Sequence, residues 1–189
     1  SLAIDRDLDD RRGIAAAIHG LANLERMHGD CVEARRGYEE SRAIGLELGD
    51  RRQVINADYG LAHLHRLQGR HMEARRVYEE LVAISRSREF GDRLEIFFSE
   101  LYAASCGASL GEQDCLARLQ DLVRRSADEL DDPFIPIRAQ VLLAETFVGL
   151  ERYSESLTAI ESAVAPLRKS GLRGLLANAE AIKAIAHDG

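Results

Sequence analysis

The side chains of this chain that could do chemistry are few and widely spread. Histidine and cysteine are common metal ligands and catalytic groups, and the chain has 6 histidines and 3 cysteines. His63 and His65 are two residues apart, so on a helix they point to different faces and cannot share a metal ion. Cys31, Cys106 and Cys115 have no ligand-like spacing. We therefore expect neither a metal nor a cofactor.

The sequence also lacks the motifs that position a reacting group. It has no glycine-rich phosphate loop, no HExxH and no GxSxG. The 32 aspartates and glutamates are typical of residues that solubilise helices. These features predict that the chain has no catalytic residues and is not an enzyme.

Two arginine pairs suggest a phosphate-binding interpretation. Arg35-Arg36 and Arg75-Arg76 stand four residues before Glu39-Glu40 and Glu79-Glu80, respectively. Opposite charges at this spacing share one face of a helix and form ion pairs, so the pairs are better explained as solvated helix surface. The formal net charge of -7 also disfavours direct binding to nucleic acid, which needs a concentrated basic face.

The distribution of apolar residues bears on the compartment. No apolar run approaches the roughly 18 residues of a membrane-spanning helix, and no signal peptide opens the chain. The odd number of cysteines, 3, fits a reducing environment. We expect a cytoplasmic chain without a membrane partner.

The elements that must position these side chains recur about every forty residues. Gly20-Leu21-Ala22 returns as Gly60-Leu61-Ala62, and Tyr38-Glu39-Glu40 returns as Tyr78-Glu79-Glu80. A fixed period in this range is typical of stacked supersecondary units, because one unit cannot bury its apolar face alone. Two weaker copies follow. One small position reads Ala22, Ala62, Ala104 and Ala144, and a second reads Ala34, Ala74, Ala117 and Ser156, with one extra residue before Ala117.

Each copy is predicted to be a pair of helices. Apolar residues from Ile14 to Leu24 keep helical spacing up to Gly29-Asp30, which would end one helix and cap the next. The second helix is expected from about Val32 to Leu48, before Gly49-Asp50 repeats the stop. Residues 1–10 are interpreted as the end of a preceding repeat, followed by repeats at 11–50, 51–92, 93–132 (degenerate) and 133–171, and by a terminal helix at 172–189. These unmatched ends predict either a fragment of a longer protein or, at the terminal helix, a solubilising cap.

The pattern Leu21, Ala22, Gly29, Asp30, Ala34 and Tyr38 resembles the tetratricopeptide repeat, in a long form of 40 or 42 residues. Similar long repeats occur in bacterial transcriptional regulators and signalling proteins, and in animal spindle-orientation adaptors. The resemblance implies an all-α, right-handed superhelix of antiparallel helical hairpins, with about ten helices here. It also implies a concave groove, lined by the first helices, for a peptide, a helix or a partner protein.

The resemblance further implies which residues face that groove. In register these are His19, Asn23, Arg26, Asn56, Tyr59, His63, Arg66, Phe98, Tyr102, Arg138 and Glu145. We expect an amphipathic segment with acidic groups near Arg26 and Arg66 and apolar anchors near Tyr102. The alternative is that these are ordinary solvated or packing residues. A clamp for a C-terminal carboxylate is not expected, since only Asn23 matches that pattern.

The sequence therefore predicts a non-enzymatic scaffold that binds a protein or peptide. We expect it to be the sensor or adaptor region of a larger cytoplasmic regulatory protein, in signal transduction or transcription regulation. Two alternatives stay open: a receptor domain for a small molecule or short peptide, and a self-assembly module that forms a homo-oligomer through its end helices.

Overall fold

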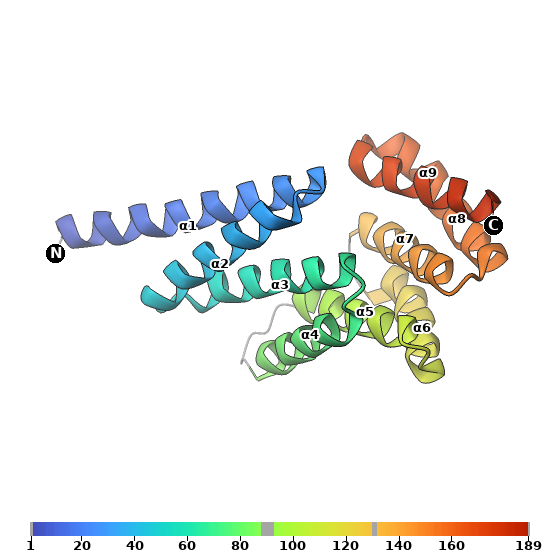
Figure 1. Ribbon diagram of the computed structural model, residues 1–189, viewed down its shortest axis with the longest axis horizontal. Helices are drawn as coiled ribbons and strands as arrows, with labels where there is room; N and C mark the ends of the chain where they lie inside the picture. The colour runs from blue at the N-terminus through green and yellow to red at the C-terminus, as the bar shows by residue number, and fades with distance from the viewer. Residues whose placement is uncertain (1, 88–92, 130–131, 189) are drawn as a thin grey trace. The chain divides into compact units, whose positions relative to one another are not determined.

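The computed structural model describes residues 2–87, 93–129 and 132–188, and these form nine α-helices and no strand (Figure 1). The helices are α1 (Leu2–His28), α2 (Cys31–Glu47), α3 (Arg51–Leu67), α4 (His71–Arg86), α5 (Arg93–Ser109), α6 (Gln113–Glu129), α7 (Phe134–Gly149), α8 (Tyr153–Ser170) and α9 (Arg173–Asp188). The prediction of an all-α helical repeat fold is confirmed.

The predicted stop-and-cap junctions are present where the sequence is most regular. Gly29 has φ of 86°, the left-handed conformation in which glycine is unstrained, and it ends α1. Asp30 then accepts a hydrogen bond from the backbone N–H of Glu33 at 3.1 Å. Asp50 accepts one from the N–H of Gln53 at 3.1 Å in the same way. These caps satisfy N–H groups that a helix cannot pair internally.

The turn inside the fourth hairpin departs from this rule. Gly29, Gly69 and Gly111 have positive φ and stand between the two helices of their hairpins, and Glu151 stands at the corresponding place with φ of 57°. A residue with a Cβ atom is strained in this conformation. The fold therefore keeps one turn geometry even where the sequence no longer supplies glycine.

The expected break near residue 10 is absent, and this corrects the sequence interpretation of residues 1–10 as a separate helix end. α1 runs without interruption over Leu2–His28. Gly13 costs a helix only about 1 kcal/mol, too little to stop it. Arg11 pairs with Glu47, and Arg12 lies 3.8 Å from Asp50, so α2 and its C-terminal turn hold this part of α1. The described residues thus have nine helices instead of about ten. The predicted repeat boundary between residues 92 and 93 borders residues 88–92, which lie outside the described residues.

The small residues expected at close helix contacts are buried with one exception. Ala22, Ala62, Ala104, Ala144, Ala34, Ala74 and Ser156 are all buried. A Cβ added to Gly37 would lie 2.8 Å from the Ala22 Cβ, which shows how closely α1 and α2 approach. Ala117 is exposed, so its assignment was wrong. Leu116 is buried there instead, because the third copy continues its 42-residue spacing from Ala74 without the extra residue.

The chain divides into two compact units, an N-terminal unit of residues 1–84 and a C-terminal unit of residues 85–189. In the N-terminal unit, α1 packs on α2, α2 on α3, and the two first helices α1 and α3 also contact each other. Ala22, Ala34, Tyr38 and Leu64 form its core cluster.

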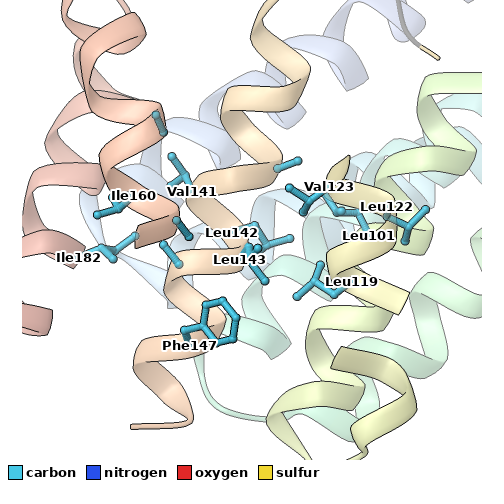
Figure 2. Packing of buried hydrophobic residues seen from close by; sticks show 14 of the residues in the cluster. Leu101, Leu119, Leu122, Val123, Val141, Leu142, Leu143, Phe147, Ile160 and Ile182 are labelled. Carbon is cyan, nitrogen blue, oxygen red and sulfur yellow. The ribbon is translucent and has the colours of Figure 1, made fainter. Parts of the chain in front are cut away.

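The C-terminal unit repeats this arrangement with a larger apolar core (Figure 2). α5 packs on α6, α7 on α8 and α8 on α9, while α7 also contacts α5 and α9. The hydroxyl groups of Ser105 and Thr146 lie 2.8 Å apart and join α5 to α7 inside the core. In both units the first helices of successive hairpins therefore lie against each other, as stacked hairpins require.

Candidate functional site

The predicted site residues of α1 converge on the ring of Tyr38 in α2. The Tyr38 hydroxyl donates a hydrogen bond to Asn23 Oδ1 at 2.8 Å and accepts one from Arg26 Nε at 3.2 Å. The His19 ring lies 5.3 Å from the Tyr38 ring, centroid to centroid. Positions 19, 23 and 26 share one face of a helix by their spacing of four and three. All three side chains are half-buried, so Tyr38 fixes the orientation of groups that still reach solvent.

Burial and the Arg26 charge shape the electrostatics of this cluster. Burial lowers the pKa of His19, and the nearby Arg26 guanidinium lowers it further. Burial raises the pKa of Tyr38, against the opposing influence of its hydrogen bond from Arg26. At neutral pH the cluster thus presents a single fixed cation, Arg26, beside two neutral rings.

The predicted residues of α3 form an aromatic cluster with Tyr78 of α4. The Tyr59 and His63 rings meet edge to face at 4.7 Å. Tyr78 lies 5.6 Å from Tyr59 and 5.8 Å from His63, and it is fully buried. Arg66 is half-buried one turn further along α3, and Asn56 is exposed one turn before Tyr59. Each hairpin of the N-terminal unit therefore carries a half-buried arginine on the same first helix as a ring that contacts the buried tyrosine of its second helix.

In the C-terminal unit the predicted residues lie on α5 and α7. The Arg138 guanidinium lies 4.5 Å from the centre of the Phe98 ring, a cation–π contact between the two first helices. Phe98 also meets Phe97 at 5.6 Å. Tyr102 packs against the core of the unit, and Glu145 is half-buried on α7. The predicted site residues thus fall into two surfaces, one in each unit.

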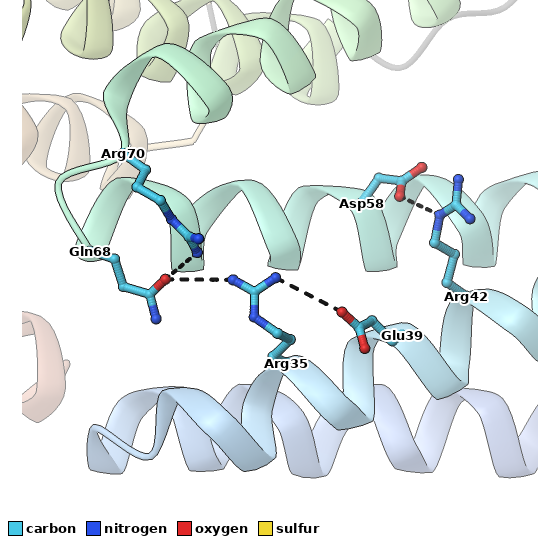
Figure 3. Close-up of polar contacts among 6 residues, drawn as sticks. All are labelled: Arg35, Glu39, Arg42, Asp58, Gln68 and Arg70. Carbon is cyan, nitrogen blue, oxygen red and sulfur yellow. Dashed lines mark hydrogen bonds and ion pairs between the residues drawn. The ribbon is translucent and has the colours of Figure 1, made fainter.

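The paired arginines on the second helices are engaged in ion pairs, three of them with the glutamate four residues later, as predicted, and Arg36 with Glu33 instead of Glu40. Figure 3 shows the pair of Arg35 with Glu39. Arg35 lies 3.9 Å from Glu39 and 3.5 Å from the side-chain oxygen of Gln68, which Arg70 also contacts. In the other pairs, Arg36 lies 3.8 Å from Glu33, Arg75 lies 2.8 Å from Glu79 and Arg76 lies 3.0 Å from Glu80. A phosphate would have to compete with carboxylates on this face.

Among the described residues, no metal site, disulfide bond or membrane-spanning helix is found. Among the described residues no group of three or more His, Cys, Asp or Glu side chains is placed to hold a metal ion. Cys31, Cys106 and Cys115 are each free of disulfide bonds. In the described part of the chain, no helix is both long enough and apolar enough to cross a membrane.

Sequence reasoning missed the organising role of Tyr38 and two further features. Gln53 of α3 donates to Ser41 at 2.5 Å and to the Ala15 carbonyl at 3.3 Å, so it joins three helices. A groove of about 420 Å³ between α6, α7 and α8 is lined by Leu143 and Phe147 with polar neighbours. The repeat of Tyr38 as Tyr78 could have indicated the role of Tyr38. The hydrogen bonds of Gln53 and the groove have no counterpart in the repeat pattern.

The arrangement defines a class of protein built from stacked helical hairpins whose first helices lie against each other within each unit. Residues 13–87 match the family model of the tetratricopeptide repeat, so this part of the chain carries tetratricopeptide repeats. Repeats of this family typically mediate contacts between proteins and are typically not enzymes.

Solved structures extend the likeness to almost the whole chain. Two crystal structures of nearly identical TPR-like repeats, assigned to a kinesin light chain from Podosopora anserina, share its fold. One of them, a form with a single substitution, has a TM-score of 0.58 and 21% identity, over 94% of this chain and 86% of its own. The second structure of these repeats has the same score and identity, over 92% of this chain and 88% of its own. No curated protein sequence matches the chain.

Proposed function

We propose that this chain is a non-enzymatic scaffold that binds a protein or peptide segment along the first helices of its repeats. The observation that carries the proposal is the ordered polar surface of the N-terminal unit. Asn23 and Arg26 are held in place by the Tyr38 hydroxyl, yet they remain partly accessible. Polar groups that are already oriented lose less entropy when a ligand binds.

The chemistry of this surface favours an acidic, amphipathic ligand. Arg26 and Arg66 occupy the same place in successive hairpins, and each follows a ring-bearing position by seven residues, His19 and Tyr59. Arginine binds carboxylates with two parallel hydrogen bonds, and aromatic rings supply apolar contact area. The partner segment would therefore place carboxylates near the arginines and apolar side chains over Tyr59 and His63.

We place the chain as the sensor or adaptor region of a larger cytoplasmic regulatory protein. The support is physical. Within each unit the successive hairpins contact one another, so a ligand that tightens or opens one contact changes the next. Such a chain can pass binding at one surface to an attached domain. Solution scattering that shows the same radius with and without ligand would contradict this relay.

The binding surface is testable without knowing the partner. A display library of random peptides is selected on the wild-type chain, and the recovered peptides are titrated against the double variant Arg26→Ala/Arg66→Ala. We expect affinity to fall at least tenfold, because ion pairs and charge-assisted hydrogen bonds to two arginines are lost together. Circular dichroism checks that the double variant stays folded.

The matched control is Arg36→Ala/Arg76→Ala. It removes the same charge at the same repeat spacing from exposed positions on the second helices. Its affinity should equal that of the wild type. Equal losses in the two double variants, or recovered peptides that ignore both, would contradict the proposed surface.

A further inference from the structure

The outer face of α1 carries an apolar stripe that the described chain leaves open. Ile14, Leu21 and Leu24 are 52%, 61% and 51% exposed, and Ala17 is exposed between them. Their spacing of three and four residues places them on one side of the helix. This side differs from the one that holds Ala15 and Ala22, which are buried in the hairpin with α2. Four apolar side chains on one exposed helix face are typical of a surface that another element covers.

The internal repeat shows what covers such a face. Forty residues on, the same positions of α3 read Val54, Ala57, Leu61 and Leu64. There Ala57 and Leu64 are fully buried, and Leu61 and Leu64 pack in one cluster with residues of α2. A Cβ added to Gly45 of α2 would lie 3.1 Å from Val54 Cγ2. This face of α3 is therefore the one that receives the second helix of the preceding hairpin.

A glycine in the middle of each stripe sharpens the comparison. Gly60 of α3 lies directly under the Tyr38 ring, and a Cβ atom at Gly60 would be only 2.5 Å from Tyr38 Cε1. Gly60 therefore forms a notch that an aromatic ring of the covering helix fills. Gly20 of α1 stands at the same repeat position, and a Cβ atom there would meet nothing within 4 Å. The notch at Gly20 has the same backbone and no ring in it.

One position distinguishes the two faces. In α3, Asp58 pairs with Arg42 of α2 at 2.6 Å, and the matching residue of α1 is Ile18. A helix that covers α1 should therefore carry an apolar side chain where α2 has Arg42. In α2 the residues three and seven positions after Tyr38 are Ser41 and Gly45, both buried. Small residues at these positions let the two helices approach.

We propose that the face of α1 formed by Ile14, Ala17, Gly20, Leu21 and Leu24 docks a partner helix. The partner helix carries an aromatic residue whose ring lies over Gly20. Counted from that residue, it has small residues three and seven positions later and an apolar residue four positions later. A second copy of this chain does not supply such a ring from α2 or α4, since Tyr38 and Tyr78 are fully buried in their own unit. The surface is independent of the ligand face that holds Arg26 and Arg66.

The probe is a stapled helical peptide with the sequence of residues 31–48, carrying Cys31→Ser and Arg42→Leu and closed between positions 36 and 40. Those two positions are exposed in α2, so the staple stays clear of the contact. Fluorescence anisotropy measures its binding to the full chain. We expect saturable binding that Gly20→Gln weakens at least tenfold, because the new side chain fills the notch. Tyr38→Ala in the peptide should weaken it to a similar extent.

The matched control is Ala43→Gln in the full chain. It introduces the same long side chain at a small, exposed residue of α2. It should leave affinity unchanged. Gly20→Gln sits on an open helix face, so it does not endanger folding. Absence of binding to the wild type, or equal affinity for the wild type and Gly20→Gln, would overturn the proposal. A chain dimer in sedimentation equilibrium that Gly20→Gln abolishes would also overturn it, since a second copy would then occupy the face.

Discussion

At the scale of single residues, one buried tyrosine decides how the candidate surface is presented. Tyr38 fills the notch at Gly60 with its ring and reaches Asn23 and Arg26 with its hydroxyl. A buried polar group must be paired, and here the pairing also fixes two groups that point to solvent. Packing of the repeat and orientation of the surface thus depend on the same side chain.

The His19 environment predicts a pH-dependent stability. Burial and Arg26 lower its pKa in the folded chain below the usual 6.5, so the unfolded chain binds a proton at a higher pH than the folded chain does. The free energy of unfolding is therefore not reduced by His19 above about pH 6.5, and it decreases as the pH falls through that value. Thermal melts at pH 7.5 and pH 5.5 should differ more for the wild type than for His19→Gln. The pKa of His65 is lowered by burial and by Arg70 and Arg35, so a smaller loss remains in the variant. Equal pH dependence in both chains would contradict the role given to His19.

The sequence predicted the residue types of the surface better than their contacts. The repeat register placed His19, Asn23 and Arg26 on one helix face, and the structure has them there. The Tyr38 hydroxyl was not assigned to them, because its partners come from another helix and depend on the crossing of α1 with α2. Whether these residues bind a partner stays a prediction.

At the scale of helices and turns, two glycines with different surroundings give a direct comparison. Gly60→Ala would press a Cβ atom against the Tyr38 ring, so we expect a loss of roughly 1–3 kcal/mol in the free energy of unfolding. Gly20→Ala meets nothing and gains helix propensity, so we expect a gain of about 0.5–1 kcal/mol. Urea denaturation of both variants measures the difference. Similar changes at the two positions would show that Gly60 does not receive the ring.

The turn at Glu151 offers a stabilising change. This residue has φ of 57°, the conformation that glycine adopts at the matching turns. Glu151→Gly should raise the free energy of unfolding by about 1 kcal/mol, since the strain of a left-handed residue with a Cβ atom is removed. Glu151→Ala keeps the strain and serves as the control. A thermal midpoint for Glu151→Gly at or below that of Glu151→Ala would contradict this account.

The hairpins were predictable because their signals are local. Glycine followed by aspartate ended and capped helices at Gly29-Asp30 and Gly49-Asp50, as expected. The continuity of α1 was not predictable in this way. Residues 1–10 resemble the end of a second helix, but no glycine–aspartate stop follows them, so the helix continues through Gly13. In the third copy the repeat pattern has an alanine at the second small position only if one extra residue precedes Ala117. The structure shows that burial follows position, with Leu116 in the small residue's place.

At the scale of the molecule, each unit builds a face from its first helices. α1 contacts α3 in the N-terminal unit, and α7 contacts α5 and α9 in the C-terminal unit. The second helices α2 and α4 carry ion-paired arginines, which makes their outer faces a solvated surface. The proposed function depends on this difference: the first helices carry the candidate binding residues, and the second helices carry ion-paired, solvated surface.

The most direct test is hydrogen–deuterium exchange of the full chain with and without a peptide selected on it. The account predicts that the peptide slows amide exchange in residues 15–28 of α1 and 55–67 of α3 more than in α2 and α4. The protection should disappear in Arg26→Ala/Arg66→Ala and persist in Arg36→Ala/Arg76→Ala. Protection confined to α2 and α4 would contradict the account.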